Sequence, residues 1–361
     1  MSLLEELLRP ELADIKPYLP APGQFRIRLD ANEAPPLFGP HVAARLAAKF
    51  SRIALERYPD ATSAELRAAF AERLRVAPEE VLLGVGSDEL ITMLMTAFVR
   101  PRRGSEPPAI LTTTPTFVMY RLSARLRGQR VVEVPLDADW DLAEESLLKG
   151  VEMCDPHVIF IASPNNPTGT LASRSRLERL IASAKRSLVV VDEAYVDYAE
   201  RDQLDLFRSH ENVVILRTLS KIGFAALRVG VLVGNRKLVA ELDKVRSPYN
   251  MNSVSQALAS VVVRDLWGDV QELVEAVKAE RARLFAELGT LPFLEITPSQ
   301  ANFLWVKTAR PAAEVYSELS ARGVLVRSFH ASAGRLARQL RITVGTPEEN
   351  DELIRCLRDL A

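Results

Sequence analysis

The feature that most constrains the fold is a series of apolar segments, rich in β-branched residues, that alternate with helix-forming stretches. The clearest of them are AILTTT (109–114), VVEVPL (131–136), HVIFIAS (157–163), SLVVVDEAY (187–195), NVVILRT (212–218) and VGVLVG (229–234). Continuous apolar runs of this kind are typical of strands buried on both faces, as in a parallel or mixed sheet covered by helices. Their alternation with helices predicts an α/β fold.

The two ends of the chain differ from this middle part. Residues 1–35 are rich in proline and predict an extended N-terminal arm that packs with a small domain. Residues 36–250 are predicted to form a large domain. Residues 251–361 are predicted to contribute a linking helix, amphipathic over roughly 262–289, and a small C-terminal α+β domain.

The composition excludes several classes of protein. The 361 residues carry 46 basic and 47 acidic side chains, and the net charge of −1 argues against binding nucleic acid through bulk electrostatics. No apolar run reaches the roughly 18 residues that a membrane helix needs. Two cysteines cannot make a disulfide framework, and four histidines lack metal-ligand spacing. We therefore expect a cytoplasmic protein without a metal site and without a nucleic-acid or membrane partner.

Lys221 is the first candidate catalytic residue. It ends the segment TLSK (218–221), which directly follows the apolar strand NVVILR. In open α/β sheets, ligands bind at the carboxyl edge of the strands, and a lysine held there can lose its proton and form an imine with a carbonyl group. A solvated surface lysine would explain the residue taken alone, so the interpretation depends on its neighbours.

Two other strand ends carry polar groups that suit the binding of a ring. Asp192 ends the strand VVVD, where a carboxylate can hold a protonated ring nitrogen, although a helix cap would also explain it. Tyr195 follows three residues later and can form a hydrogen bond with a neighbouring phenolate oxygen. The motif SPNNPTG (163–169) fixes a rigid turn after another strand, which pre-organises Asn166 to bind a ligand.

The segment GVGSDE (84–89) is a candidate phosphate site. Its small residues lead into a helix, whose N-terminal N–H groups favour an anion. Ser87 fits such a site, but ordinary capping of the helix would explain it as well. Arg228, seven residues after Lys221, is a candidate cation for the same phosphate.

In this order, the motifs GSDE, SPNNPTG, DEAY and TLSK resemble those of the fold-type-I pyridoxal-phosphate aminotransferases. Within that fold the chain is most similar to the histidinol-phosphate aminotransferase family. The resemblance covers almost the whole chain, and the other segments that carry it are KPYLP (16–20), LDANEAP (29–35), RYPD (57–60), PTFVMY (115–120), TLSKIGFAALRVG (218–230), QANFLWV (300–306) and LRITVGT (340–346).

The resemblance implies a cofactor site for pyridoxal 5'-phosphate. Lys221 would form the imine with the cofactor and carry the proton, while Asp192 would pair with the pyridinium nitrogen. Asn166 and Tyr195 would hold the phenolate oxygen. The other cofactor-binding positions that it implies are Gly86, Ser87, Asp88, Phe117, Thr218, Ser220, Arg228 and Tyr58.

The resemblance also implies how the substrate binds and how subunits share the site. Arg341 would bind the acidic end of the substrate, and Tyr18, Asn32 and Asn166 would contact it as well. Tyr58 would reach the cofactor phosphate of a partner subunit, so the active unit would be a homodimer. Phe117 stands where this family usually has a tyrosine that stacks on the pyridine ring, and a phenyl ring keeps the π face.

The implied reaction is amino transfer between L-histidinol phosphate and 2-oxoglutarate in L-histidine biosynthesis, by a ping-pong route through Lys221. Two alternatives on the same scaffold stay open from sequence. One is transamination of an aromatic amino acid, and the other is decarboxylation of threonine phosphate. A non-enzymatic DNA-binding regulator is disfavoured because no basic recognition element is present.

Overall fold

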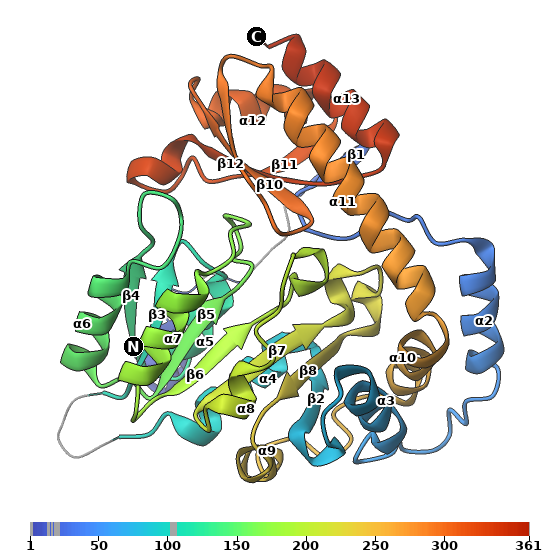
Figure 1. Cartoon of the computed structure of the whole chain (residues 1–361), viewed down its shortest axis with the longest axis vertical. Coiled ribbons are helices and arrows are strands. Elements are labelled where there is room, and N and C mark those ends of the chain that lie inside the picture. Colours follow the sequence, from blue (N-terminus) through green and yellow to red (C-terminus); the bar gives the residue numbers. More distant parts are fainter. Residues whose placement is uncertain (1–2, 13–14, 16, 18–21, 102–106, 361) are drawn as a thin grey trace.

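The computed structural model describes residues 3–12, 15, 17, 22–101 and 107–360, which form two sheets of unequal size (Figure 1). The larger sheet has the strand order β2-β8-β7-β6-β5-β3-β4. Its strands are β2 (Val81–Val85), β3 (Ala109–Thr114), β4 (Arg130–Pro135), β5 (Val158–Ala162), β6 (Leu188–Asp192), β7 (Val213–Thr218) and β8 (Val229–Val233). The run from β4 to β7 is parallel and only β8 is antiparallel to its neighbours, which confirms the predicted α/β fold with a mostly parallel sheet.

The central strands are buried on both faces because their alternate residues pack into two separate apolar cores. Val189 and Ile215 point into one core, and Val190 and Val214 point into the other. The first core is covered by helices that include α3 (Ala64–Leu74), α6 (Glu144–Cys154), α7 (Arg174–Ser183), α8 (Leu206–Ser209) and α10 (Ser253–Asp265). The second core is covered by α4 (Gly86–Phe98), α5 (Val118–Arg125) and α9 (Arg236–Asp243).

The smaller sheet joins the two ends of the chain. Its strand order is β1-β11-β12-β10-β9, and β1 pairs in parallel with β11, with Ile27 opposite Val324. The strands are β1 (Ile27–Leu29), β9 (Leu294–Thr297), β10 (Phe303–Thr308), β11 (Val324–Ser328) and β12 (Gln339–Thr343). Helices α12 (Ala312–Ala321) and α13 (Pro347–Arg358) and the end of α11 (Trp267–Gly289) close a third core on this sheet.

The remaining helical segments are α1 (Leu3–Leu7) and α2 (Pro40–Phe50), with the 3-10 turns η1 (Pro10–Leu12), η2 (Pro78–Glu80), η3 (Val196–Tyr198), η4 (Leu219–Lys221), η5 (Ala225–Leu227) and η6 (Gly334–Arg338). Val42 of α2, Tyr198 of η3 and Leu219 of η4 pack into the first core. None of the helices in the described ranges is long and apolar enough to cross a membrane.

The prediction of one continuous helix over 262–289 is wrong. Helix α10 ends at Asp265, and α11 begins at Trp267 after the buried Leu266. The apolar pattern continues through the break, since Leu266 and Val270 belong to the same core, and periodicity therefore hides it. Local composition explains the restart, because Gly268 disfavours a helix interior and an acidic residue such as Asp269 suits a first turn.

Helix α11 ties the two sheets together. It runs from the larger sheet up to the smaller one (Figure 1). The guanidinium of Arg281, midway along it, donates from Nη1 to the carbonyl oxygen of Tyr198 at 3.2 Å and to that of Ala301 at 2.8 Å. Tyr198 belongs to η3, beside the larger sheet, and Ala301 precedes β10 of the smaller sheet. The Arg281 side chain thus helps to set the distance between the smaller sheet and the larger sheet.

We expect Arg281→Met to lower the free energy of unfolding by about 1–3 kcal/mol, because two half-buried carbonyls lose a charged donor. Urea unfolding of both proteins measures this difference. Lys278→Met on the same helix removes only an exposed pair with Glu275 and should change stability by less than about 0.5 kcal/mol. Equal effects of the two substitutions would contradict the role of Arg281.

Candidate active site

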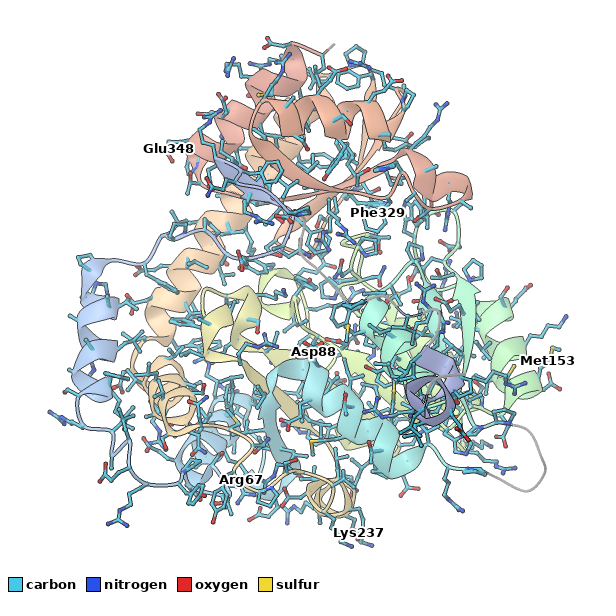
Figure 2. The ribbon with its side chains drawn as sticks, turned by 180° about the vertical axis from the view of Figure 1, so that it is seen from behind. Arg67, Asp88, Met153, Lys237, Phe329 and Glu348 are labelled. Carbon is cyan, nitrogen blue, oxygen red and sulfur yellow. The ribbon has the colours of Figure 1, made fainter. Side chains whose placement is uncertain are left out.

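The polar strand ends predicted from sequence meet at one edge of the larger sheet. Strands β5, β6 and β7 are parallel neighbours, and Asp192 at the end of β6 is in register with Ala162 of β5 and Leu216 of β7. The SPNNPTG turn therefore starts beside Asp192 on one side, and the η4 turn with Lys221 starts on the other. Helix α4 begins at the same edge, and Figure 2 shows Asp88 at the end of α4 nearest the middle of the molecule.

Asp192 carries a charge at a buried position. Its carboxylate is 4% exposed and accepts hydrogen bonds from the hydroxyl of Tyr120 at 2.6 Å and from the N–H of Ala194 at 3.0 Å. Burial raises the pKa of Asp192 to about 6, although these two donors and the charge of Lys221 act to lower it. The negative charge of the Asp192 carboxylate is therefore only partly neutralised by its surroundings, and a cationic ring nitrogen would neutralise it.

Tyr120 is a functional residue that the sequence analysis missed. It lies on α5, is fully buried, stacks on Phe160 at 4.8 Å between ring centroids, and donates to Asp192. Burial also raises the pKa of its phenol, so the hydroxyl stays a donor. A tyrosine at a helix position with apolar neighbours looks like core, and the sequence gives no signal for its polar contact.

Lys221 lies on the η4 turn, with its ammonium group near Asp192 and Tyr195. Its Nζ atom is 5.8 Å from the centroid of the Tyr195 ring. The turn is fixed from two sides. Thr218 accepts the N–H of Ser220 and donates to the carbonyl of Val229, and the Tyr198 hydroxyl donates to the carbonyl of Lys221 at 2.6 Å. The backbone that carries the amine is thus held rigidly below the site.

Tyr195 joins the site to the N-terminal segment and the smaller sheet. Its hydroxyl accepts a hydrogen bond from Nδ2 of Asn32 at 2.9 Å, so its own proton is available for donation to a ligand. Asn32 is buried and is held by the hydroxyl of Thr343 and the side-chain amide of Asn302. Thr343 and Asn302 lie in the segments LRITVGT and QANFLWV, but they were not predicted as site residues, because they position Asn32 and do not stand at the end of an apolar strand of the larger sheet.

Arg341 and Asn166 are brought together across the two sheets. Arg341 lies on β12 of the smaller sheet and donates from Nη1 to the side-chain oxygen of Asn166 at 2.6 Å. Its Nη2 donates to the carbonyl oxygen of Asp30, and its guanidinium lies 5.5 Å from the centroid of the Phe303 ring. The side chain is 9% exposed, so a planar cation is held ready at the site in a mostly buried place.

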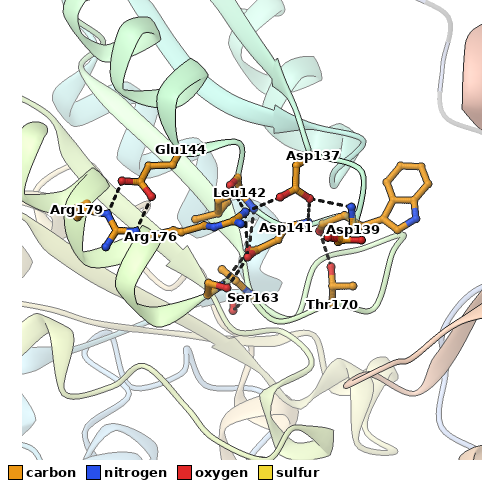
Figure 3. Close-up of polar contacts among 12 residues, drawn as sticks. Asp137, Asp139, Asp141, Leu142, Glu144, Ser163, Thr170, Arg176 and Arg179 are labelled. Carbon is orange, nitrogen blue, oxygen red and sulfur yellow. Dashed lines mark hydrogen bonds and ion pairs between the residues drawn. The ribbon is translucent and has the colours of Figure 1, made fainter.

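A loop of the larger domain supports the turn that carries Asn166. The Thr170 hydroxyl, one residue past this turn, donates to the carbonyl of Trp140 at 2.8 Å in the loop between β4 and α6 (Figure 3). That loop is itself held by the Arg176 guanidinium, which pairs with the Asp137 carboxylate. The turn is therefore fixed by side chains from two elements and does not depend on its prolines alone.

The start of α4 and the loop after η5 form a close-packed cradle. Gly86 has φ of +74°, and a Cβ there would lie 2.6 Å from Nη2 of Arg228. A Cβ on Gly230 would lie 2.6 Å from the backbone nitrogen of Ser87. Because α4 begins at Gly86, the alternative that Ser87 caps the helix is wrong. Arg228 donates to Asp88 at 3.3 Å, and both side chains are partly exposed.

Three further predicted residues lie apart from this cluster or outside the described part of the chain. Phe117 precedes α5 and contacts Tyr120 edge to face, with 5.6 Å between ring centroids. Tyr58 is 83% exposed and stacks on Tyr249, with 4.9 Å between ring centroids. Tyr18 lies outside the residues that the structure describes.

The donor set fits pyridoxal phosphate. Asp192 is a desolvated carboxylate that lacks a fixed cation, as the ring nitrogen requires, and Tyr195 has a proton to donate to the phenolate oxygen. The backbone cradle at the start of α4, where Gly86 has a φ of +74° and no Cβ, lies beside the guanidinium of Arg228. The N–H groups at that helix start and the cation of Arg228 suit the phosphate.

Comparisons of sequence agree with this chemistry. The sequence profile of aminotransferase class I and II matches residues 27–357. The histidinol-phosphate aminotransferase 1 of Carboxydothermus hydrogenoformans is 40% identical over 352 residues, which cover 96% of this chain and 97% of that protein. The histidinol-phosphate aminotransferase of Chromobacterium violaceum is 39% identical over 356 residues, which cover 98% of each.

Comparisons of structure show the same fold. The histidinol-phosphate aminotransferase from Sinorhizobium meliloti, solved in complex with pyridoxal-5'-phosphate, superposes with a TM-score of 0.85 at 24% identity, covering 98% of both chains. The L-threonine-O-3-phosphate decarboxylase from Porphyromonas gingivalis gives a TM-score of 0.77 at 20% identity, covering 92% of this chain and 99% of that one. At these identities the structures establish the fold alone.

The pKa of Asp192 predicts a pH dependence of the apoprotein's stability. Between its ordinary pKa of 3.8 and about 6, the folded apoprotein holds a proton that the unfolded chain has released. The contribution of this carboxyl to the free energy of unfolding is therefore fully present below about pH 4 and is lost as the pH rises through about 6. As the pH rises from about 4 to above 6, the free energy of unfolding of Asp192→Asn should increase by up to about 3 kcal/mol relative to that of wild type. The reason is that the amide stays neutral whereas the buried carboxyl of wild type must ionise.

Urea unfolding of the two apoproteins at several pH values measures this trend. Adding the cofactor supplies the missing cation to wild type, so the trend should disappear in the holoprotein, which serves as the control. A stability difference that is constant with pH in the apoproteins would show that Asp192 has no raised pKa.

Proposed function

The chain belongs to the aminotransferase class I and II family, and from that premise we propose that it transfers an amino group between L-histidinol phosphate and 2-oxoglutarate. The products are imidazole-acetol phosphate and L-glutamate, and the pathway is the biosynthesis of L-histidine. The observation that carries the proposal is the 36–40% identity, over nearly the full length, to relatives named as histidinol-phosphate aminotransferases. The site residues supply the chemistry that this reaction needs.

The protein is a pyridoxal-phosphate-dependent enzyme with the fold-type-I aminotransferase fold. When bound, the cofactor supplies an aldehyde that combines with amines and a ring that delocalises the electrons released when a C–H bond breaks. Asp192 would hold the ring nitrogen, Asn166 and Tyr195 the phenolate oxygen, and Phe117 one face of the ring. The phosphate would bind at Ser87, Asp88 and the cradle formed with Arg228.

Asp192 keeps the ring nitrogen protonated because its buried negative charge favours a cation beside it. Tyr120 keeps this carboxylate in place, since its hydroxyl donates to one oxygen and the N–H of Ala194 donates to the other. Without these two donors, a desolvated carboxylate would cost more free energy to keep ionised. These hydrogen bonds therefore orient the Asp192 carboxylate without neutralising its negative charge.

Lys221 serves as the base and acid of the reaction. Its amine sits at the end of a stiff turn beside Tyr195 and can hold a proton taken from the substrate's carbon and return it one step later. The carbonyl of Lys221 is anchored by Tyr198, so the backbone stays still while the side chain moves. This rigidity keeps the amine within reach of both positions between which the proton is exchanged.

Arg341 gives the site its preference for acidic substrates. A guanidinium binds a phosphate or a carboxylate through two parallel hydrogen bonds, and histidinol phosphate carries a phosphate whereas glutamate carries two carboxylates. The contacts of Arg341 with Asn166 and Asp30 hold its plane in a fixed direction. The same cation would therefore serve both halves of a ping-pong cycle.

We place the active unit as a cytoplasmic homodimer with shared sites. Tyr58 and Tyr249 form a stacked aromatic pair that is largely exposed on the single chain, and an exposed pair of this kind suits burial against a second copy. Tyr58 would then contact the cofactor phosphate of the partner subunit. The domain boundaries at residues 35 and 250 and the substrate contact of Tyr18 also remain proposals.

The substrate proposal is tested by steady-state assays of the holoenzyme with three amino donors. We expect kcat/KM for L-histidinol phosphate to exceed that for phenylalanine by about tenfold or more, because its phosphate offers Arg341 nearly twice the negative charge of the phenylalanine carboxylate. Lys221→Ala should lose more than about 1000-fold in turnover and keep the fold. Release of carbon dioxide from threonine phosphate without amino transfer would move the function to a decarboxylase.

Subunit mixing tests the shared site. Tyr58→Ala should weaken the cofactor phosphate contact in the partner subunit, whereas Lys221→Ala inactivates the site of its own chain. A mixed dimer of these two variants contains one site with both residues intact. Activity should therefore rise on mixing above the average of the two homodimers. Activity that equals this average, in dimers shown to exchange subunits, would place Tyr58 outside the partner's site.

A further inference from the structure

A cavity of about 320 Å³ lies behind the turn that carries Lys221. Leu219 and Ile222, which flank this turn, form one wall, and the first turns of α11 form another. These residues belong to the apolar core on one face of the larger sheet, whereas Phe117 and Tyr120 of the active site pack on the other face. The cavity is therefore a separate space that shares the Lys221 turn with the active site.

The walls of the cavity combine apolar surface with four charged side chains, two of each sign. Phe70 of α3 and Trp267 of α11 supply aromatic surface, and Arg73 and Asp197 supply two of the charges. Arg217 and Glu275 also line the cavity, but both are already paired. The Arg217 guanidinium is engaged by two carboxylates outside the cavity wall, those of Glu193 at 2.7 Å and Asp202 at 2.8 Å, and Glu275 pairs with Lys278 at 2.8 Å. The charges open to a ligand are thus those of Arg73 and Asp197.

Arg73 and Asp197 line the cavity, and neither has an ion-pair partner in the described part of the chain. The Arg73 guanidinium lies over the Trp267 ring, 4.2 Å from its centroid, and has no hydrogen-bond acceptor or ion-pair partner there. The Asp197 carboxylate makes no ion pair either, and burial raises its pKa. Arg217 and, more weakly, Arg73 attract the Asp197 carboxylate and act to lower its pKa, but neither lies close enough to form an ion pair with it.

A ligand that satisfies both groups must carry a carboxylate for Arg73 and a cationic nitrogen for Asp197, joined by a short link. It must also have an apolar or aromatic part for the walls near Phe70 and Trp267. A free α-amino acid has this combination, and the volume suits a molecule of that size. We propose that this cavity is a second, regulatory site that binds a free α-amino acid with an aromatic or apolar side chain.

The position of the cavity provides a route from this ligand to catalysis. Asp197 and Tyr198 are adjacent in η3, and the Tyr198 hydroxyl donates to the carbonyl oxygen of Lys221 at 2.6 Å. On the other side, Leu219 and Ile222 contact the cavity directly and flank the catalytic lysine. An amino acid that binds to Asp197 and contacts Leu219 and Ile222 changes the conformation of the turn that carries Lys221, and it thereby changes the turnover rate.

Binding is tested by titrating the holoenzyme with each common amino acid while following tryptophan fluorescence, with the visible absorption of the cofactor as a separate record of active-site binding. We expect at least one aromatic or apolar amino acid to give a saturable fluorescence change that Trp267→Phe removes. Arg73→Gln and Asp197→Asn should each weaken this binding about tenfold or more, because each removes one charged contact.

Two control variants separate the cavity from the active site. Glu72→Gln neutralises an exposed charge on α3 that does not line the cavity and should leave the fluorescence titration unchanged. Arg341→Gln should impair turnover yet keep the Trp267 signal, so failure of the proposed function and failure of this inference give different results. The ligand should change the turnover of wild type by about twofold or more and leave that of Arg73→Gln unaffected.

Three results would overturn the proposal. The first is the absence of any saturable Trp267 signal with amino acids up to about 10 mM, since a regulatory site must bind within that range. The second is binding that Arg73→Gln and Asp197→Asn leave at wild-type strength. The third is a ligand that binds in the cavity without altering turnover, which would contradict the coupling through the Lys221 turn.

Discussion

The structure is organised around one carboxylate that is kept out of water. Asp192 ends the central strand β6, where neighbouring strands cover both sides and helices cover both faces. A buried charge costs several kcal/mol unless a partner offsets it, and two hydrogen bonds from Tyr120 and Ala194 offset only part of that cost. The part of this cost that the two hydrogen bonds do not offset makes the site selective for a flat ligand with a cationic nitrogen.

The second constraint is that neither sheet alone contains the site. The larger sheet supplies Asp192 and Lys221, while Arg341 comes from the smaller sheet and Asn32 from the segment that follows β1. Contacts between the two parts therefore set the distance from Asp192 and Lys221 to Arg341, the residues that we propose hold the cofactor and bind the acidic end of the substrate. One such contact is Arg335, which stacks on Trp140 at 3.7 Å and donates to two carbonyls of the β4–α6 loop.

Much of this arrangement could be predicted because strand ends are readable in sequence. A buried parallel strand must be apolar, so a polar residue directly after it, such as Asp192 or Lys221, stands out and has a known location at the sheet edge. Tyr120 and Thr343 could not be found in this way. Each lies within a helix or strand whose pattern is already explained by burial, and its polar contact depends on tertiary packing.

The same reasoning explains where the predictions of elements and roles were wrong or incomplete. The break at Leu266 does not interrupt the apolar pattern, because its side chain packs into the core that the flanking helices share. The start of α4 at Gly86 depends on a positive φ and on the approach of Arg228, neither of which a capping rule contains. The exposed stack of Tyr58 on Tyr249 would have the proposed role only in a dimer, which the single chain does not contain.

The most direct test of the central claim is the protonation state of the cofactor's ring nitrogen in the holoenzyme. Reconstitution with ¹⁵N-labelled pyridoxal phosphate allows this state to be measured by NMR as a function of pH. The account predicts a nitrogen that stays protonated at about pH 8 in wild type and loses its proton in Asp192→Asn, because only the buried carboxylate favours the cation. An unprotonated nitrogen in the wild-type enzyme at that pH would contradict it.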